Sequence, residues 1–260
     1  MAIQLNDRDH LIFKLIDEHE VLLEKHISWF IAGEDKPVLI RDRLRKLFYL
    51  DYLLCHRHGS KLPWWTTPTK PLVYMLSPMT RGLSGFADNQ DELLANDFQR
   101  HHLEVANLRM LYLMAQKDQQ ICEFTWKTMK QERQSETALD AMASFNCGGS
   151  ASRVGVVNNL RGDCSRTVLD KLSNSLAKEN IEFILLISRD DADKTALQKS
   201  ISEFGDALSA KCFFATHQEL YRDGMVGTRW QLANGQQADL FKQGEVTFMP
   251  GIAGSQSIAV

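Results

Sequence analysis

The sequence lacks the features that mark membrane, secreted and disordered proteins. Its most apolar run, residues 181–187, is far shorter than the roughly 18–20 residues that cross a bilayer. Residues 7–9 are all charged, where a signal peptide would have an apolar core. Glycine and proline are sparse, and no internal repeat or low-complexity tract occurs. We therefore expect a folded, cytoplasmic protein without a membrane segment.

Paired cysteines and phosphate-binding loops are also missing. The five cysteines are widely spaced, odd in number and form no Cys-x-x-Cys pair. This distribution predicts reduced thiols and argues against a structural zinc site. The glycine-containing turn at residues 147–150 lacks the Lys-Ser/Thr ending of a phosphate-binding loop. The sequence thus predicts no bound cofactor.

A basic segment stands out from this background. The chain carries a net charge of −3 at pH 7, yet residues 36–70 hold eight Lys or Arg against two Asp. Such a local reversal of sign predicts a surface that faces a polyanion, and DNA is the first partner to consider.

The first 87 residues have the element pattern of a winged helix-turn-helix. The pattern predicts, in order, a helix beginning at Asn6 or Asp7, a short helix around residues 27–31, a third helix from Val38 to about Leu50, strands at 51–56 and 72–76, and a further helix capped by Ser77. Three helices followed by a β-hairpin predict a DNA-binding domain in residues 1–87.

In such a domain the third helix enters the major groove, and the hairpin contacts the backbone or the minor groove. The candidate DNA-contacting side chains are Arg41, Arg43, Arg45, Lys46, Arg57, His58, Lys61, Trp64 and Lys70. The alternative is that Arg43 and Lys46 are simply the solvated face of an amphipathic helix, and that Trp64 and its neighbour Trp65 form a protein interface.

Residues 88–250 are predicted to form a mixed α/β domain, followed by a flexible tail over residues 251–260. A long helical pattern over 86–118 leads into this domain, and the apolar period then changes to that of strands. Strands are predicted at 122–126, 141–145, 153–157, 181–187 and 212–216, and helices at 167–179 and 191–208. The expected fold class is therefore α/β, or α+β, with a mixed sheet.

The order of several short segments resembles the replication-relaxation family and the related MobC-type plasmid mobilisation proteins. These segments are LNDRDHLI (5–12), RLRKLFYLDYLL (43–54), VYMLSPMTRG (73–82), HLEVANLR (102–109), LD (139–140), FAT (214–216) before Leu220, and GTRW (227–230). Together they run through nearly the whole chain. The resemblance implies a winged helix joined to a restriction-endonuclease-like domain that works on plasmid or integrative-element DNA.

A nuclease of that type needs an Asp and then, on the next strand, an acidic residue and a Lys two positions apart. The carboxylates hold Mg²⁺, which activates water, and the Lys stabilises the developing charge. Asp140 matches the first acid, but residues 153–159 contain no carboxylate, and Asn158 or Asn159 would be a weak neutral ligand. Glu104, on the preceding helix, is a possible further acid but is interpreted as an ordinary surface residue. The domain is therefore predicted to be catalytically inactive, with Asp140 as a vestigial site residue.

The sequence thus predicts a sequence-specific DNA-binding regulator or accessory factor for plasmid or mobile-element DNA, acting in mobilisation, replication or transcription control. The expected partners are double-stranded DNA, a second copy of the chain, and conjugation or replication proteins, in a bacterial cytoplasm at the nucleoid or a plasmid. Two alternatives stay open. One is a metal-dependent MobC-type relaxase or nickase at a transfer origin, using Mg²⁺, and the other is a regulator that senses a ligand through its C-terminal domain.

Overall fold

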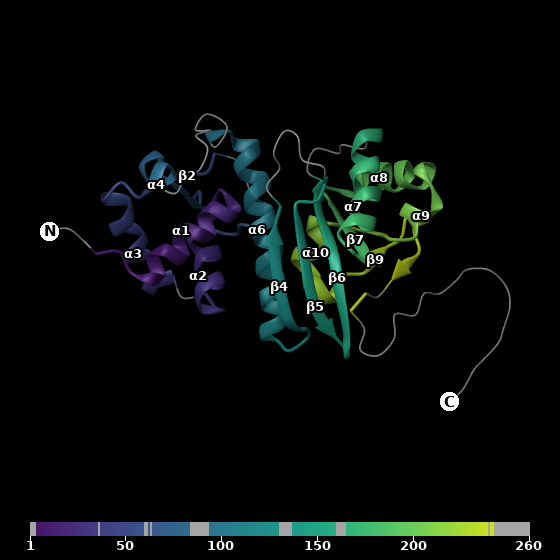
Figure 1. Ribbon diagram of the computed structural model, residues 1–260, viewed down its shortest axis with the longest axis horizontal. Coiled ribbons are helices and arrows are strands. Elements are labelled where there is room, and N and C mark those ends of the chain that lie inside the picture. The colour runs from purple at the N-terminus through teal and green to yellow at the C-terminus, as the bar shows by residue number, and fades with distance from the viewer. Residues whose placement is uncertain are drawn as a thin grey trace.

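The computed structural model describes residues 4–35, 37–59, 62, 64–83, 94–129, 137–159, 165–238 and 240–241. It is a mixed α/β fold in which a helical N-terminal part and a seven-stranded sheet lie on opposite sides of one long helix, α6 (Figure 1). The predicted α/β fold class is confirmed. The predicted tail, residues 251–260, lies outside the described residues.

The N-terminal part consists of helices around a small sheet. Its elements are α1 (Asp7–His19), β1 (Leu22–Leu23), α2 (Glu24–Ala32), α3 (Pro37–Tyr49), β2 (Leu53–Arg57), β3 (Leu72–Leu76) and α4 (Pro78–Leu83). The sheet is antiparallel with strand order β1-β3-β2. The predicted third helix and the two strands after it are present, whereas β1 has only two residues and gave no sequence pattern.

Local sequence determines where α1 begins. The Asn6 side chain accepts from the Asp9 backbone amide, and the Asp9 carboxylate accepts from the Asn6 amide, which makes a reciprocal capping box. The helix then buries an apolar stripe that includes Ile12 and Ile16 against Leu44 of α3. This stripe is the core of the N-terminal part.

Helix α6 (Asn96–Lys117) belongs to both halves of the molecule. Leu103 packs with Val73 and Met75 of β3, whereas Leu108 and Tyr112 pack on the large sheet. A helix that is apolar on opposite faces is expected to be buried between two layers. The helix predicted from residue 86 starts at Asn96, and residues 84–93 lie outside the described part of the chain.

The large sheet has strand order β10-β9-β8-β7-β6-β5-β4. Its strands are β4 (Cys122–Thr128), β5 (Ala141–Cys147), β6 (Ser150–Asn159), β7 (Phe183–Ser188), β8 (Cys212–Thr216), β9 (Trp230–Gln231) and β10 (Gln237–Ala238). β6, β7 and β8 are parallel to one another, and the other neighbours pair antiparallel. The β5–β6 hairpin turns at Gly148 and Gly149, whose φ angles of 58° and 86° favour glycine.

Helices cover both faces of this sheet (Figure 1). They are α7 (Arg166–Lys178), α8 (Asp191–Phe204), the short α9 (Asp206–Ser209) and α10 (His217–Gly227). Leu172 of α7 and Leu197 of α8 pack on one face, and Leu220 of α10 packs with α6 on the other. Parallel strands sandwiched in this way explain the nearly continuous apolar run of β7. Within the described residues, no helix is both long and apolar enough to cross a membrane.

Candidate nucleic-acid interface and a buried polar cluster

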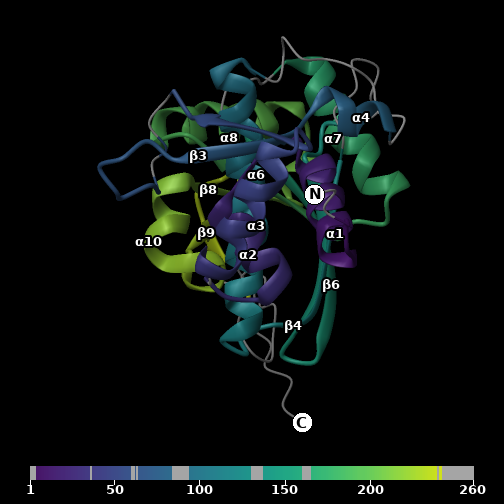
Figure 2. The ribbon, with the colours of Figure 1, turned by 90° about the vertical axis from the view of Figure 1, so that its left-hand side faces the viewer.

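Helix α3 lies at the end of the molecule opposite the α7 and α8 layer (Figure 1), and from that end it faces the viewer (Figure 2). Arg41, Arg45 and Lys46 are exposed on it, and the side chains of Arg41 and Arg45 are 52% and 59% exposed. Asp42 is exposed on the same helix and lies 3.7 Å from Arg45. The outward surface of α3 is therefore mixed in charge, with cations in the majority.

Arg43 points into the protein instead. Its Nε donates to Asp9 Oδ1 at 2.6 Å, and its terminal nitrogen pairs with Asp9 Oδ2. Asp9 is fully buried, and burial alone would raise the pKa of its carboxyl group. The hydrogen bonds from Arg43 and the Asn6 backbone outweigh burial, so the pKa is lowered. Arg43 fastens α3 to α1, which makes it a structural residue in this conformation.

Arg41 is also held by a carboxylate. Its Nε lies 3.1 and 3.2 Å from the two Glu24 oxygens, and a terminal nitrogen lies 2.8 Å from Oε1. This two-pronged contact joins α3 to the start of α2. Of the four predicted cations on α3, Arg45 and Lys46 are therefore the two that no contact ties to another helix in the described part of the chain.

The residues predicted to contact DNA from the end of β2 to the start of β3 differ in their exposure. Arg57 and Lys70 are exposed, and Arg57 donates to the Lys70 carbonyl at 2.9 Å. His58 was predicted at the exposed tip, but it is fully buried and its Nδ1 lies 3.1 Å from Gln99 Oε1. Burial lowers the pKa of His58. The prediction for His58 is wrong because His58 comes directly after β2 and packs against α6. Lys61 lies outside the described residues.

Trp64 is half-buried between the two parts of the chain. Its ring centroid lies 5.4 Å from His26 of α2 and 6.3 Å from Tyr221 of α10. Figure 2 shows the segment before β3 extending to the same side of the molecule as α10. Trp64 therefore makes an internal contact between the N-terminal part and α10.

A second group of polar residues gathers where β5 begins and β6 ends. Asp140 precedes β5, and its Oδ2 accepts from the Asn158 backbone amide at 2.6 Å. Its Oδ1 lies 2.8 Å from His101 Nε2 on α6, and the Asn158 side chain donates to the His101 carbonyl at 3.3 Å. Asp140 and Asn158 are each 3% exposed. The structure thus places Asp140 against Asn158, one of the two asparagines that the sequence offered as a neutral ligand.

Glu104 joins this group from α6. It was interpreted as a surface residue, but it is fully buried, so that interpretation is wrong. Its Oε1 accepts from Arg100 Nε at 3.0 Å, and its Oε2 lies 3.0 Å from His217 Nε2. Burial would raise the pKa of Glu104, and the contacts with His217 and Arg100 outweigh it and lower the pKa. Glu104 is buried because α6 is covered on two sides, by the N-terminal part and by the large sheet with α10.

His217 and Tyr221 complete the group, which we call the buried polar cluster: Arg100, His101, Glu104, Asp140, Asn158, His217 and Tyr221. His217 Nε2 lies 2.7 Å from Asn158 Oδ1, and the Tyr221 hydroxyl lies 2.9 Å from His217 Nδ1. Burial raises the pKa of Tyr221 well above its ordinary range, so its hydroxyl keeps its proton. With its proton kept, the Tyr221 hydroxyl can donate to His217 Nδ1.

No helix was predicted over α10, so His217 and Tyr221 were not among the predicted site residues. A signal was present, since Thr216 and Glu219 have capping-box spacing. The Thr216 hydroxyl accepts from the Glu219 amide at 3.2 Å, and the Glu219 carboxylate accepts from the Thr216 amide at 2.6 Å. This cap starts α10 directly after β8 and places His217 on its first turn.

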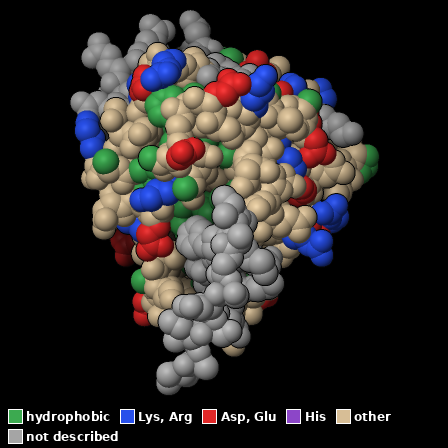
Figure 3. Space-filling model, turned by 90° about the vertical axis from the view of Figure 1, so that its right-hand side faces the viewer, with side chains coloured by type: hydrophobic (Ala, Val, Ile, Leu, Met, Phe, Trp, Pro, Cys, Tyr) green, Lys and Arg blue, Asp and Glu red, His purple; other side chains and the backbone are tan. Residues whose placement is uncertain are grey.

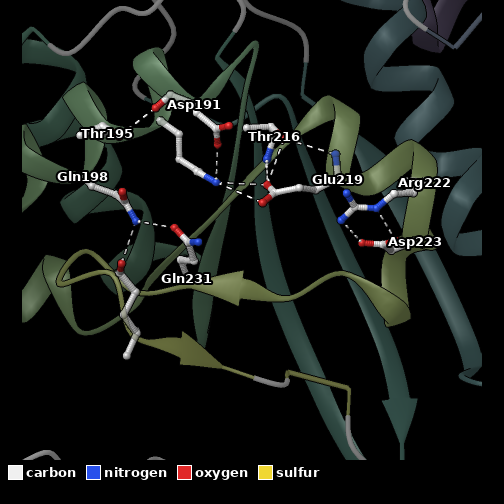
Figure 4. A network of polar contacts seen from close by, with 10 residues as sticks. Asp191, Thr195, Gln198, Thr216, Glu219, Arg222, Asp223 and Gln231 are labelled. Atoms are coloured by element: carbon white, nitrogen blue, oxygen red, sulfur yellow. Dashed lines mark hydrogen bonds and ion pairs between the residues drawn. The ribbon is translucent and has the colours of Figure 1, made fainter.

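A neighbouring network holds α10 against α8 (Figure 4). Lys194 is 5% exposed, and its Nζ lies 2.9 Å from Asp191 and 3.1 Å from Glu219. Burial would lower the pKa of Lys194, but the hydrogen bonds to Asp191 and Glu219 outweigh it, so the pKa is raised. Gln198 donates to Gln231 in the same view. These contacts fix the helix that carries His217.

The chemistry available to the buried polar cluster follows from its partners. Both carboxylates are engaged by protein donors, and the residue of β6 that contacts Asp140 is the neutral Asn158. Within the described residues, no three or more His, Cys, Asp or Glu side chains are grouped so as to hold a metal ion. As arranged, the cluster links α6, β6 and α10.

Comparisons with known proteins gave no relative. No protein-family model, no curated protein and no solved structure matches the chain. The resemblance to the replication-relaxation family therefore stays a prediction that rests on short segments of sequence.

Proposed function

We propose that this protein binds double-stranded DNA through the exposed face of α3, assisted by Arg57 at the end of β2 and Lys70 before β3. The observation that carries the proposal is the outward placement of Arg45 and Lys46 on a helix at the free end of the molecule (Figure 2). The order of three helices and a β1-β3-β2 sheet supports treating α3 as a recognition helix.

The distribution of charge supports the same proposal. Figure 3 shows the opposite end of the molecule, where Lys/Arg and Asp/Glu side chains are interspersed. Phosphate contacts need cations that are free to leave their own partners. The exposed Arg45–Asp42 pair, at 3.7 Å in high dielectric, is a weak interaction that DNA phosphates can replace.

The biological setting that we propose comes from the sequence resemblance: a regulator or accessory factor for plasmid or mobile-element DNA. A metal-dependent nickase is the second candidate, and one observation favours it, namely that Glu104 and Asp140 gather at one end of the large sheet. Asn158 and His217 lie between these two carboxylates and occupy them, which favours the non-catalytic proposal.

The proposal is tested by selecting duplexes from a random library and measuring affinity by fluorescence anisotropy. The variant R45A/K46A is compared with the control R166A/K199A on α7 and α8. The side chains of Arg166 and Lys199 are 78% and 77% exposed, and each has a surface ion pair within its own helix. We expect the first variant to lose at least about tenfold in affinity and the control to bind like the native protein. Equal binding by all three proteins would refute α3 as the contact surface.

The nickase candidate has its own test. Supercoiled plasmid carrying the selected site is incubated with the protein and Mg²⁺ or Mn²⁺. Binding without nicking supports the proposed function, whereas site-specific nicking that is lost in Asp140→Ala would replace it with the nickase.

A further inference from the structure

Tyr49 at the C-terminal end of α3 is unusually exposed for an aromatic side chain. It is 73% exposed, more than any other large apolar side chain that the structure describes. Phe48 beside it is 39% exposed, and the two ring centroids are 5.7 Å apart at an interplanar angle of 52°. Two adjacent exposed aromatic rings are a feature that a partner can recognise.

The aromatic pair continues the cationic face of α3. Residues four apart lie on one side of a helix, so Arg41, Arg45 and Tyr49 form a single stripe. All three are exposed, and Lys46, three residues before Tyr49, is exposed on the same helix. Arg41 on this stripe is paired with Glu24, so the stripe presents the solvent-facing cation Arg45 one turn before the aromatic surface at its end.

The charge on the stripe selects its occupant. In a twofold dimer the same stripe would face itself, and Arg45 and Lys46 of the two copies would repel each other. An acidic polymer with apolar groups between its charges fits both parts of the stripe. Duplex DNA has this character, because its major groove displays the thymine methyl group between two rows of phosphates.

We infer that Tyr49 is a base-reading residue that contacts a thymine C5-methyl group in the major groove, while Arg45 and Lys46 contact phosphates. This inference rests on the proposed function and assigns sequence preference to one side chain. Phe48 packs against the Tyr49 ring and limits the positions that it can take, so less conformational entropy is lost when the contact forms.

The test uses the full-length protein and the best duplex from the library selection. Each thymine of the site is replaced in turn by uracil, which removes only the methyl group. We expect that replacing thymine by uracil at one position lowers the affinity of the native protein about tenfold. The same replacement should leave the affinity of Tyr49→Ala unchanged. Tyr49→Phe keeps the ring, so it should bind within about twofold of the native protein.

Two further measurements separate this inference from the proposed function. The dependence of affinity on salt should be unchanged in Tyr49→Ala, because that variant loses no phosphate contact. If the native protein binds duplex DNA through Arg45 and Lys46, yet neither uracil nor Tyr49→Ala changes affinity, the inference alone is overturned. If Tyr49→Ala converts a dimer to a monomer in sedimentation without changing DNA affinity, the occupant is a second copy and the inference is also overturned.

Discussion

The outward face of α3 and the buried polar cluster differ in how their charged side chains are exposed and paired. On α3, Arg45 and Lys46 are exposed, and Arg45 has a weak surface ion pair with Asp42 at 3.7 Å. In the cluster, Glu104 is fully buried and receives both Arg100 and His217 at 3.0 Å. An exposed cation can exchange its partner for a phosphate at a small cost in free energy. Removing the partner of a buried carboxylate strongly destabilises the fold, because the charge stays buried without compensation.

The same contrast occurs within α3 itself. Arg43 and Arg45 are two positions apart, yet Arg43 pairs with buried Asp9 and Arg45 faces solvent. The number of cations in the segment therefore overstates the surface that is available to DNA. Burial thus decides whether a charged side chain of α3 stabilises the fold or stays exposed for a partner.

Removing the buried carboxylate should have the largest effect. Glu104→Ala leaves His217 and Arg100 without their common partner, and we expect a loss of about 3–5 kcal/mol in the free energy of unfolding by urea. Glu203→Ala, whose side chain is 68% exposed and lies 3.9 Å from Lys199, should change it by less than about 0.5 kcal/mol. Similar losses in the two variants would erase the distinction between the regions.

Removing the inward arginine of α3 should have the next largest effect. Arg43→Ala leaves the Asp9 carboxylate buried without its ion-pair partner, so we expect a loss of about 2–3 kcal/mol. Arg45→Ala is the matched control on the same helix and should lose less than about 0.5 kcal/mol. If Arg45→Ala destabilises the protein as much as Arg43→Ala, the assignment of inward and outward roles fails.

Buried histidines between the two parts of the chain should make stability depend on pH. Burial, and then the charge of Lys25, lower the pKa of His26 to about 3. Between pH 6.5 and pH 3 the unfolded state therefore binds a proton at His26 that the folded state does not bind, and stability falls as pH falls. From pH 6.5 to pH 5 we expect a loss of about 2 kcal/mol from this residue.

The measurement for His26 is urea unfolding at pH 5 and at pH 7.5 for the native protein and His26→Gln. The variant lacks the titrating group, so its stability should fall less over this range. An equal fall in both proteins would show that His26 does not titrate as its burial requires.

Sequence periodicity identified most elements because each depends on residues close together in the chain. The predicted strand at 212–216 coincides with β8, and the predicted strand at 72–76 coincides with β3. The helix predicted over 191–208 instead ends at Phe204, because Gly205 adopts a φ of 152° and starts the separate α9.

The candidate sites were harder to predict because their partners are distant in sequence. Asp9 precedes Arg43 by 34 residues, and Asn158 precedes His217 by 59. No local pattern says which arginine of α3 turns inward or that His58 is covered by α6. Such assignments follow from packing between elements, which a single sequence does not display.

The most direct measurement is the salt dependence of duplex DNA binding by the native protein, R45A/K46A and the control R166A/K199A. Each phosphate contact contributes about 0.9 to the slope of log affinity against log salt concentration. We expect the slope of R45A/K46A to be smaller than the native slope by about 2, with the same thermal midpoint, and the control slope to equal the native one. An unchanged slope in R45A/K46A, or no salt-dependent binding by the native protein, would contradict the claim that the outward face of α3 binds DNA.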